Sequence, residues 1–447
     1  MSNKSFSVNT CNKIKNFKKT ISVDSDKSIS IRSLLIASIS HNISEIYNIL
    51  ESEDVFSTIK CLKKLGIKIK RVKPGNFLVH GKGLGSFFIK KNKSLDCGNS
   101  GTLARLLIGI LATTPNIEVV IKGDKSLSKR NMSKIIKLMK LFGADFLPKK
   151  KVNLPLKLIS SNMPVGIKYE AGVSAQLKSS VMLAALNSYG ETCIVEKNES
   201  RNHTENILLK YSNVIKIKKN IIKISGKGNL NSINVNVPAD PSSAAFFVAL
   251  TILKENSFLK IKGVMLNPRR TGFYKLLKKS GAKIVFKNIK KKNNEIIGDV
   301  LVSSSNLKPV NASSKYYAST TDEYPILFVI AALTKGTSVF SGIENLANKE
   351  SNRILEMKKI LTQVGVKCIH TKNKMKIFGL SKNNFYKKNI IVKNLGDHRI
   401  CMSAMVLSQL TGINTQIENF ETVNTSSPSF LKIIKLLGGK FEIKKVS

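Results

Sequence analysis

Apolar and polar positions along this chain follow a pattern that repeats. Segments with apolar residues at helical spacing are followed by short segments in which apolar and polar residues alternate. In one helical segment, the positions i, i+3, i+4 and i+7 are occupied by Ile135, Leu138, Met139 and Phe142. Near the C-terminus, the same spacing is occupied by Phe430, Ile433, Ile434 and Leu437. This spacing puts the apolar side chains on one helix face. The pattern predicts amphipathic helices that each lead into a strand.

Each of these helices is predicted to end at a residue suited to a left-handed C-cap. Five end at a glycine: Gly66, Gly143, Gly281, Gly365 and Gly438. In the longest gap between them, LLKYSNVIKIKK places Asn213 where the other repeats have glycine, and asparagine is the next-best residue for this conformation. The six positions are roughly 70–85 residues apart, a period that indicates repeated supersecondary modules.

The repeats also contain short β-rich runs, among them FLVHG, IEVVIKG, CIVEK and SVFSG. Each module therefore mixes strands with helices, and we expect an α/β (α+β) fold. Six modules divide naturally into two domains of three. We expect the boundary near VPADP, with a second crossing near Ser22–Ser25 after an N-terminal strand. Residues 1–22 and 241–447 would then form one domain, and residues 23–240 the other.

A glycine-rich loop precedes one strongly apolar helix. The segment LDCGNSGTLARLLIGIL places Gly98, Gly101 and Arg105 immediately before a continuous apolar run. Glycine lets the backbone approach a ligand closely, and a helix N-terminus favours an anion. The loop is therefore either an anion-binding site or a tight turn that leads into a core helix.

The net charge is +46, a value that suggests nucleic-acid binding. The lysines, however, are spread over the whole chain and mixed with Asn and Ile. Aromatic residues make up only 6% of the chain and Trp is absent, so residues that could stack on bases are scarce. We expect most lysines to form a solvated basic surface and no nucleic acid to bind.

Arginine is rare against this background. Nine of the 74 basic residues are arginines, at positions 32, 71, 105, 130, 201, 269, 270, 353 and 399. Lysine cannot replace arginine where a planar guanidinium binds a phosphate or carboxylate through two hydrogen bonds. Arg130, Arg201 and Arg353 each precede a predicted helix, which is unfavourable for a cation unless an anion lies between them. The arginines therefore indicate anion-binding positions, and for these three a structural ion pair is the alternative. We expect Arg269 and Arg270 to serve domain structure, and Arg71 has no assigned role.

Other features restrict the class of protein. No apolar segment reaches the roughly 18–20 residues that a membrane-spanning helix needs, and the N-terminal residues contain no hydrophobic signal region. The six cysteines are far apart and form no CxxC motif, which argues against a zinc site or a disulfide framework. We expect a cytoplasmic protein, not bound to a membrane, that uses no metal and no other cofactor.

Nine short motifs follow one another along the chain: KSISIR, GNSGTLAR, GDKSLSKRNM, SAQLKS, ADPSSAAFF, NPRRTGF, TDEYP, KESNR and DHRICMS. In this order, and over nearly the whole chain, the sequence resembles 5-enolpyruvylshikimate-3-phosphate (EPSP) synthases. The resemblance implies the two-domain enolpyruvyl transferase fold, an inside-out α/β barrel. In that fold each domain is built from three βαβαββ units, and substrates are held in the cleft between the domains.

EPSP synthases transfer the enolpyruvyl group of phosphoenolpyruvate to the 5-hydroxyl of shikimate 3-phosphate and release phosphate, within the shikimate pathway of aromatic amino-acid biosynthesis. By resemblance, the shikimate 3-phosphate site comprises Lys27, Ser28, Arg32, Ser174, Ala175, Gln176, Ser200, Arg201, Asp322 and Lys349. The phosphoenolpyruvate site comprises Lys27, Gly101, Arg130, Gln176, Arg353 and Arg399. Supporting positions are Asn99, Arg105 and His398. Both substrates are polyanions, which accounts for the arginines.

The reaction requires a base for the attacking hydroxyl and an acid for the methylene carbon. Asp322 is expected to be the base, and Lys27 and Glu350 are candidates for the acid and for recovery of its proton. Asp322 could instead serve only as a helix N-cap. Arginine and lysine can neutralise the leaving phosphate, so no metal is required. We expect a monomer whose partners are its two small-molecule substrates.

Three positions depart from the family pattern. Asn131 follows Arg130 where proline is usual, which leaves the start of the next helix open. The segment NTSSPSF at 424–430 lacks a lysine that many relatives have, and Asn352 replaces a commoner aspartate in KESNR. Gly101, in contrast, has no side chain and leaves room beside the phosphoenolpyruvate site. We therefore expect inhibition by glyphosate.

Two alternatives remain at this point. UDP-N-acetylglucosamine enolpyruvyl transferases share the fold, but they typically carry a loop cysteine in the second or third module. The corresponding segment here, TTPNIEVVIKGDKSLSKR, contains none, and KSISIR and DHRICMS also favour the shikimate enzyme. A basic nucleic-acid-binding protein is the second alternative, which the scattered lysines disfavour.

Overall fold

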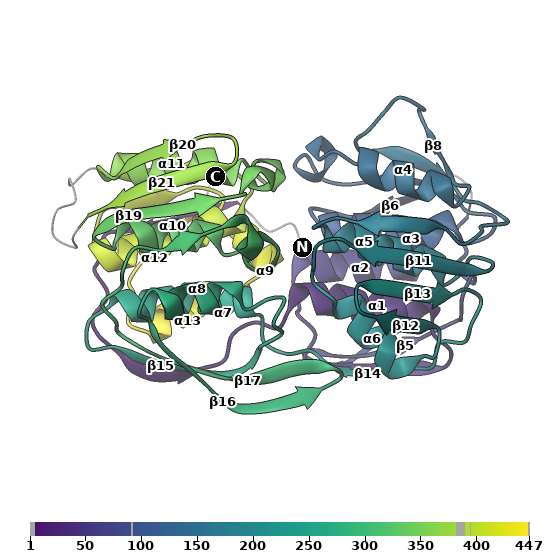
Figure 1. Cartoon of the computed structure of the whole chain (residues 1–447), viewed down its shortest axis with the longest axis horizontal. Helices are drawn as coiled ribbons and strands as arrows, with labels where there is room; N and C mark the ends of the chain where they lie inside the picture. The colour runs from purple at the N-terminus through teal and green to yellow at the C-terminus, as the bar shows by residue number, and fades with distance from the viewer. Residues whose placement is uncertain (1–4, 91–92, 381–388, 394, 446–447) are drawn as a thin grey trace. The chain divides into compact units, whose positions relative to one another are not determined.

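The computed structural model describes residues 5–90, 93–380, 389–393 and 395–445. Within these residues the strands form six four-stranded sheets, and the chain divides into two compact units (Figure 1). The N-terminal unit consists of Ser25–Val237 and Lys291–Glu295. The C-terminal unit consists of Met1–Asp24, Pro238–Lys290 and Ile296–Ser447. Among the described residues, every helix is too short or too polar to cross a lipid bilayer.

Three of the sheets belong to the N-terminal unit. In hydrogen-bonding order, the first is β14 (Asn234–Asn236), β3 (Ile43–Tyr47), β5 (Asn76–His80) and β4 (Lys68–Lys73). The second is β6 (Ser94–Asp96), β7 (Glu118–Lys122), β9 (Leu156–Ile159) and β8 (Asp145–Leu147). The third is β10 (Lys168–Ala171), β11 (Glu191–Glu196), β13 (Ile221–Ser225) and β12 (Ile215–Lys218). The helices are α1 (Lys27–Ile39), α2 (Glu53–Lys64), α3 (Gly101–Ala112), η1 (Leu127–Lys129), α4 (Ser133–Leu141), α5 (Ala175–Ala185) and α6 (His203–Tyr211).

The other three sheets belong to the C-terminal unit. The first is β22 (Ile390–Val392), β23 (Thr415–Ile417), β1 (Phe6–Thr10) and β24 (Glu442–Lys445). The second is β16 (Lys283–Lys292), β17 (Glu295–Ser303), β15 (Phe258–Met265) and β2 (Lys18–Ile21). The third is β18 (Asn311–Ala312), β19 (Gly336–Ser341), β21 (Lys374–Gly379) and β20 (Lys367–His370). The helices are α7 (Pro241–Leu253), α8 (Gly272–Lys279), η2 (Ser314–Tyr316), α9 (Tyr317–Thr320), α10 (Tyr324–Ala332), η3 (Glu344–Asn348), α11 (Arg353–Gln363), α12 (His398–Thr411), η4 (Phe420–Thr425) and α13 (Phe430–Leu436).

All six sheets repeat one strand arrangement. An outer strand is parallel to its neighbour, and the third strand is antiparallel to the second. Along the chain, β6, α3, β7, α4, β8 and β9 follow one another, which is one complete βαβαββ module. The mixed α/β fold with a repeated module, predicted from the sequence, is therefore confirmed.

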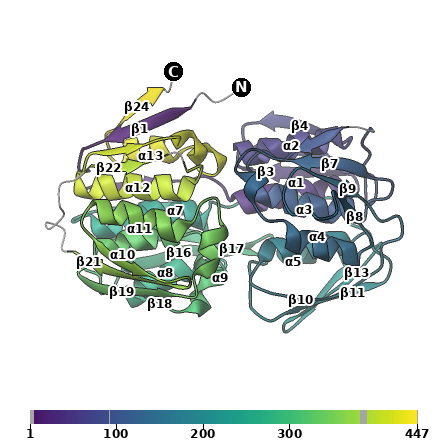
Figure 2. The same ribbon diagram turned by 90° about the horizontal axis from the view of Figure 1, so that it is seen from above.

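Some modules are completed by a strand from a distant part of the chain. β2 is parallel to β15, with Ile21 opposite Ile261, and β14 is parallel to β3, with Val235 opposite Ile46. β1 lies between β23 and β24, so the first strand of the chain joins the last sheet (Figure 2). The N-terminal strands β1 and β2 thus both belong to sheets of the C-terminal unit.

Helices, not strands, occupy the centre of each unit. Every residue of α7 and α10 is buried, and α10 contacts α7, α11 and α12. In the N-terminal unit, α3 packs along α5. Strands such as β11 and β13 alternate between buried and more exposed side chains, so one face of each sheet covers the helices. This arrangement leaves the helix ends as the natural places for a binding site.

The five predicted glycine C-caps are confirmed, with φ angles of 87°, 90°, 96°, 84° and 95° at positions 66, 143, 281, 365 and 438. The prediction for Asn213 is wrong. Helix α6 ends at Tyr211, and Ser212 is extended with φ −153° and ψ 164°. Ser212 leaves the helix directly into an antiparallel bridge with Leu230, so no left-handed residue is needed to turn the chain.

Asp24 ends the first segment of the C-terminal unit and binds a loop of the same unit. One of its oxygens, Oδ2, accepts hydrogen bonds from the Ser427 hydroxyl at 2.9 Å, the Ser429 N–H at 3.1 Å and the Ser429 hydroxyl at 2.7 Å. Burial raises the pKa of the Asp24 carboxyl above its ordinary value of 3.8, and the serine hydrogen bonds only partly oppose this shift. The folded state therefore binds this proton more tightly than the unfolded chain does.

The raised pKa of Asp24 predicts a pH-dependent stability effect. A carboxyl with a raised pKa stabilises the fold fully below its unfolded pKa, and this contribution is lost as the pH rises through the folded pKa. Asn in its place stays neutral and can still accept these hydrogen bonds. Asp24→Asn should therefore gain stability relative to the unmodified chain as the pH rises from about 4 through the folded pKa of Asp24, measured by chemical denaturation.

Asp299 provides a control of opposite sign. Although burial raises the pKa of Asp299, hydrogen bonds from Gly263, Asn288 and Lys260 outweigh burial and lower it. Asp299→Asn should therefore lose stability relative to the unmodified chain as the pH rises toward about pH 4, and the difference should change little between about pH 4 and about pH 7. A stability difference for Asp24→Asn that does not change with pH would contradict the role given to burial.

Candidate functional site

Apart from Arg130, which ends η1, the predicted site residues of the N-terminal unit lie at or near the beginnings of four helices, α1, α3, α5 and α6. Ser100 and Ser174 are the N-caps of α3 and α5, and their hydroxyls accept from Leu103 N–H and Leu177 N–H. Neither helix has an acidic residue in its first turn. The positive ends of these helix dipoles therefore favour an anion.

Lys27 begins α1, immediately after the N-cap Asp26. Its Nζ lies 3.0 Å from Oδ2 of Asp54, and the two side chains are 17% and 6% exposed. An ammonium group has three N–H donors, so this pair leaves donors for a ligand. Ser28, the next residue, is half-buried.

Arg32 lies one turn further along α1 and is only 3% exposed. Its Nε donates to Thr204 Oγ1 at 3.0 Å, and its Nη2 donates to Ser179 Oγ at 3.2 Å. Its Nη1 donates to the carbonyl oxygen of Ser28 at 3.0 Å. Arg32 thus connects α1 to α5 and α6, in addition to the binding role expected from the sequence.

The glycine-rich loop brings two arginines to the beginning of α3. A Cβ atom added to Gly101 would lie 2.8 Å from Nη1 of Arg105 and 2.8 Å from Nη1 of Arg130. Arg105 Nη1 donates to Gln176 Oε1 at 2.9 Å, and Arg130 Nη2 donates to Asn99 Oδ1 at 3.0 Å. The loop, both guanidinium groups and Gln176 therefore form one cluster, as an anion-binding site requires.

Asn131, which departs from the family pattern, starts the next helix by a local hydrogen bond. Its Oδ1 accepts from the N–H of Ser133 at 2.7 Å, and α4 begins at Ser133. Arg130 ends the short helix η1 in an extended conformation. The asparagine side chain thus performs locally the helix-starting role for which proline is usual.

Ser200 and Arg201 precede α6. Ser200 is 2% exposed, and both its N–H and its hydroxyl donate to Oε1 of Glu196, at 3.2 and 3.3 Å. Arg201 is half-buried. The turn between β11 and α6 is therefore held by a buried carboxylate.

In the C-terminal unit, three carboxylates surround Arg353, which is 1% exposed. Its Nε lies 2.9 Å from Asp397 Oδ2, its Nη2 2.8 Å from Glu350 Oε2, and its Nη1 3.6 Å from Asp322 Oδ1. Burial by itself lowers the pKa of the guanidinium, but the three carboxylates outweigh it and raise the pKa above its ordinary value. Both acidic residues expected to transfer protons are thus paired with one buried arginine.

The N-cap alternative for Asp322 is not supported. Helix α10 begins at Tyr324, and the residue at its N-cap position is Glu323 rather than Asp322. Asp322 lies one residue further out, with its side chain 20% exposed. Its carboxylate therefore remains accessible. Lys349, just after η3, is half-buried.

Arg399 lies in the first turn of α12, next to His398, and the two residues are 4% and 5% exposed. Its guanidinium carbon lies 5.9 Å from the centre of the Phe246 ring. Within the described part of the chain, its Nε and Nη1 are buried and have no hydrogen-bond partner. Buried donors without partners are costly, so this guanidinium is suited to an anionic ligand.

Other arginines form structural ion pairs. Arg71 binds Glu51 through Nε at 2.7 Å and Nη2 at 2.6 Å at the surface. Arg270 is 2% exposed, and its Nη2 donates to Asp240 Oδ1 at 3.0 Å. Arg71, which had no assigned role, thus forms a surface ion pair, and Arg270 forms a buried ion pair within the C-terminal unit.

Three acidic residues that contact predicted site residues of their own unit received no role from the sequence: Asp54, Glu196 and Asp397. Asp397 is fully buried and binds Arg353, and its Oδ2 also accepts from the Ser351 hydroxyl at 2.9 Å. Only 28 residues of the chain are acidic. Their rarity is the feature that could have indicated them, by the same argument that singled out the arginines.

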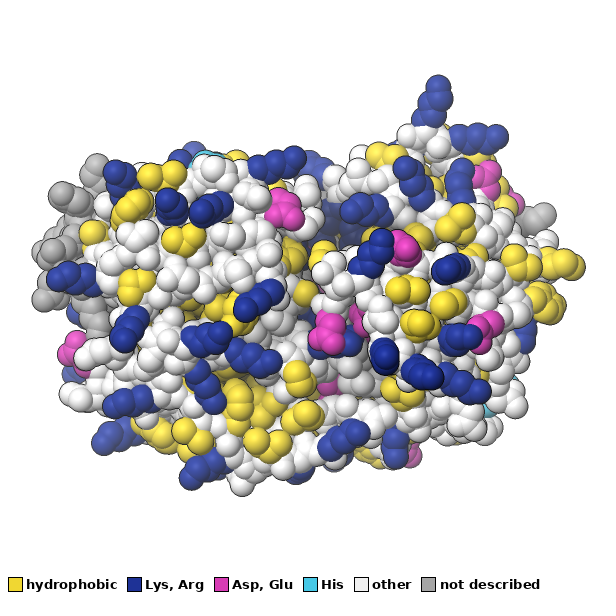
Figure 3. Space-filling model, viewed as in Figure 1, with side chains coloured by type: hydrophobic (Ala, Val, Ile, Leu, Met, Phe, Trp, Pro, Cys, Tyr) yellow, Lys and Arg dark blue, Asp and Glu magenta, His cyan; other side chains and the backbone are white. Residues whose placement is uncertain are grey.

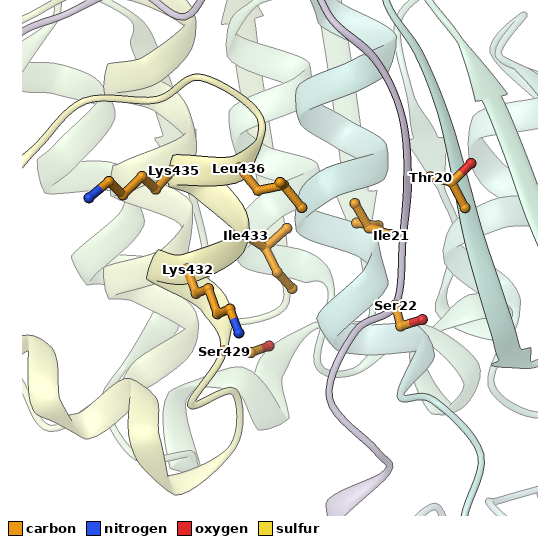
Figure 4. A pocket seen from close by; sticks show the side chains of 8 residues that line it. All are labelled: Thr20, Ile21, Ser22, Ser429, Lys432, Ile433, Lys435 and Leu436. Carbon is orange, nitrogen blue, oxygen red and sulfur yellow. The ribbon is translucent and has the colours of Figure 1, made fainter.

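A separate pocket of about 460 Å³ lies in the C-terminal unit beside α13 (Figure 4). Its lining consists of Thr20, Ile21, Ser22, Ser429, Lys432, Ile433, Lys435 and Leu436. None of the predicted site residues is among them. The pocket is therefore distinct from the clusters described above.

Comparisons with known proteins agree with the motifs. The family model described as EPSP synthase (3-phosphoshikimate 1-carboxyvinyltransferase) matches residues 11–434. A 3-phosphoshikimate 1-carboxyvinyltransferase of a Thermoanaerobacter species is 39% identical over 421 residues, which cover 94% of this chain and 97% of the relative. One from Paracoccus denitrificans is 36% identical over 425 residues, covering 94% and 95%. The solved structure of the Acinetobacter baumannii EPSP synthase has a TM-score of 0.85 and 33% identity, covering 98% of this chain and all of that one.

The fold, together with the lysine and arginine side chains at the N-termini of its helices, defines a transferase of the enolpyruvyl transferase class. The family match spans nearly the whole chain. The two relatives are more than 30% identical to this chain over almost its full length and almost their own. The chain belongs to the EPSP synthase family.

Proposed function

We propose that the chain transfers the enolpyruvyl group of phosphoenolpyruvate to the 5-hydroxyl of shikimate 3-phosphate, with release of phosphate, in aromatic amino-acid biosynthesis. Its membership of the family supports this activity. The structural observation that carries the proposal is Arg399, whose buried guanidinium has two donors without partners among the described residues. A reaction between two polyanions needs such groups.

We assign the substrates to residues of both units. Shikimate 3-phosphate would be bound by Lys27, Ser28, Arg32, Ser174, Ala175, Gln176, Ser200, Arg201, Asp322 and Lys349. Phosphoenolpyruvate would be bound by Lys27, Gly101, Arg130, Gln176, Arg353 and Arg399, with Asn99, Arg105 and His398 in support. The cluster at the start of α3 and the unsatisfied donors of Arg399 support the second assignment.

The chemistry proceeds by addition and elimination. Asp322 takes the proton of the 5-hydroxyl while the hydroxyl oxygen bonds to C2 of phosphoenolpyruvate. In the same step the methylene carbon of phosphoenolpyruvate gains a proton from Lys27 or Glu350. The C2–O bond to phosphate then breaks, and the methyl group returns its proton, which restores the double bond. Lysine and arginine neutralise the developing phosphate. Arg353 lies beside both acidic groups and can stabilise their charged forms.

Phosphate release tests the proposal directly. The purified chain should release phosphate from phosphoenolpyruvate only when shikimate 3-phosphate is also present. Turnover with UDP-N-acetylglucosamine as the acceptor would favour the related transferase. Salt-sensitive DNA binding without phosphate release would favour the nucleic-acid alternative.

On the face drawn in Figure 3, lysine and arginine side chains are scattered, as expected for a solvated basic surface.

Cellular location and assembly are part of the same proposal. We place the protein in the cytoplasm as a monomer. All six cysteines are free thiols, as is usual in a reducing compartment.

Gly101→Ala is expected to raise the KM for phosphoenolpyruvate about tenfold, equivalent to the loss of one good hydrogen bond. The added methyl group would lie 2.8 Å from Nη1 of both Arg105 and Arg130. These are the ends of flexible side chains, so the fold can adjust, but the guanidinium groups must move away. Steady-state kinetics with each substrate varied in turn would measure the effect.

Gly172→Ala is the matched control, because a methyl group there would meet no atom within 4 Å. Its KM values should stay within about twofold of the unmodified chain. An unchanged KM for phosphoenolpyruvate in Gly101→Ala would remove the loop from the proposed site.

Inhibition by glyphosate stays a prediction, and unchanged turnover at saturating glyphosate would refute it.

A further inference from the structure

A lysine with no solvent exposure lies behind the predicted binding residues of the N-terminal unit. The Nζ atom of Lys178, on α5, is 2.5 Å from Oε1 of Glu196 and 2.5 Å from Oε1 of Glu205. The side chains of the two glutamates are only 5% and 2% exposed. Glu196 ends β11 and Glu205 is in the first turn of α6. This buried triad therefore joins three elements.

The triad is also bonded to the turn that carries Ser200 and Arg201. Oε1 of Glu196, the same oxygen that meets Lys178, accepts the Ser200 N–H at 3.2 Å and the Ser200 hydroxyl at 3.3 Å. Hydrogen bonds to a charged acceptor are stronger than neutral ones. The turn before α6 is thus anchored to an oxygen whose place is set by a lysine on α5.

A second connection runs parallel to the first. Thr204 donates its hydroxyl to Ser179 Oγ at 2.8 Å, and Arg32 donates to both residues. Residues 178 and 179 of α5 therefore meet residues 204 and 205 of α6. The same α5 carries Ser174 and Gln176 at its beginning, so the contacts link both groups of predicted substrate-binding residues.

Burying three charged side chains is costly, and a well-packed apolar cluster of similar volume is often at least as stable. A role in positioning explains the arrangement better than stability alone. We propose that Glu196, held in place by Lys178, positions Ser200 for the anionic cyclitol phosphate, shikimate 3-phosphate. This inference rests on the proposed function.

The two glutamates offer a matched pair of variants. Removing either one leaves a single lysine–glutamate pair, so both variants change the buried charge of the triad equally, from −1 to zero. Only Glu196 touches Ser200. Glu196→Ala should raise the KM and the Kd for shikimate 3-phosphate about tenfold, with the KM for phosphoenolpyruvate within about twofold. Glu205→Ala should leave both KM values within about twofold.

Conservative variants supply a second readout. Gln at position 196 keeps an oxygen that can accept from Ser200, so Glu196→Gln should restore most of the affinity for shikimate 3-phosphate. If Glu196→Ala does not fold, Glu196→Asp carries the test, with Glu205→Asp as its control. It keeps the charge but withdraws the acceptor by one carbon, so the same selective rise in KM is expected.

Three results would overturn the inference: an unchanged KM for shikimate 3-phosphate in Glu196→Ala, an equal rise in Glu205→Ala, or an equal rise for both substrates. The phosphate-release assay on the unmodified chain separates a failure of this inference from a failure of the proposed function. If that chain releases phosphate only with both substrates present, a negative result concerns the positioning role of Glu196 alone. If it does not, the proposed function itself fails.

Discussion

Lys27→Met is expected to lower kcat by about 10²–10⁴-fold, the range usual for loss of a group that transfers a proton. Methionine keeps the length of the side chain and removes only the ammonium group. The cap of α1 is unaffected, because Asp26 accepts from the Ile29 N–H through its own side chain at 2.7 Å. Phosphate release at saturating substrates measures kcat, and thermal unfolding checks that the fold is intact.

The pairing of Lys27 with Asp54 requires a control. Without the lysine, a carboxylate with a side chain only 6% exposed loses its cation, which by itself lowers stability. The double variant Lys27→Met/Asp54→Asn removes the unpaired charge and should recover stability without recovering kcat. Lys134→Met, at an exposed position on α4, should change neither. Near-normal turnover in Lys27→Met would end the catalytic assignment.

Asp322→Ala should also lower kcat by about 10²–10⁴-fold, because the attacking hydroxyl loses its base. The fold should persist, since Arg353 keeps Asp397 and Glu350 as partners at 2.9 and 2.8 Å. Asp322→Asn should lose as much activity as Asp322→Ala, because an amide of the same shape cannot accept the proton. Single-turnover and steady-state phosphate release would both show the loss.

Glu356→Gln is the control for a lost carboxylate on the same unit. Glu356 pairs with the exposed Lys359 at 2.8 Å, and such a surface pair contributes little. Its kcat should match that of the unmodified chain. Turnover by Asp322→Asn at a normal rate would mean that Asp322 serves Arg353 rather than the substrate, and the base would have to be sought elsewhere.

The repeated module could be predicted because its determinants are local. Helical spacing, a glycine C-cap and a following strand all lie within a few residues of one another, and five of the six caps were predicted correctly. The sixth, at Asn213, failed because a contact with the distant Leu230 makes Ser212 leave the helix in an extended conformation. A tertiary contact decided a local conformation there.

In the candidate site, too, some features could be predicted from the sequence and others depend on tertiary contacts. The rarity of arginine indicated which residues to examine, and the motifs ordered them. Neither the rarity of arginine nor the motifs showed that Arg71 forms a surface ion pair, that Arg353 is surrounded by carboxylates, or that Arg399 has unsatisfied donors. Those differences depend on which acidic residues lie nearby, and Asp397 is 44 residues away from Arg353 in the chain.

The sequence by itself determined the modules, the family and the residue types of the site, because these depend on periodicity, composition and short motifs. Only the tertiary structure decided how each charge is compensated. The partners of Lys27, Lys178 and Arg353 come from separate elements, and the energy of a charged group depends on its burial and on the charges within a few ångströms. No local pattern contains that information.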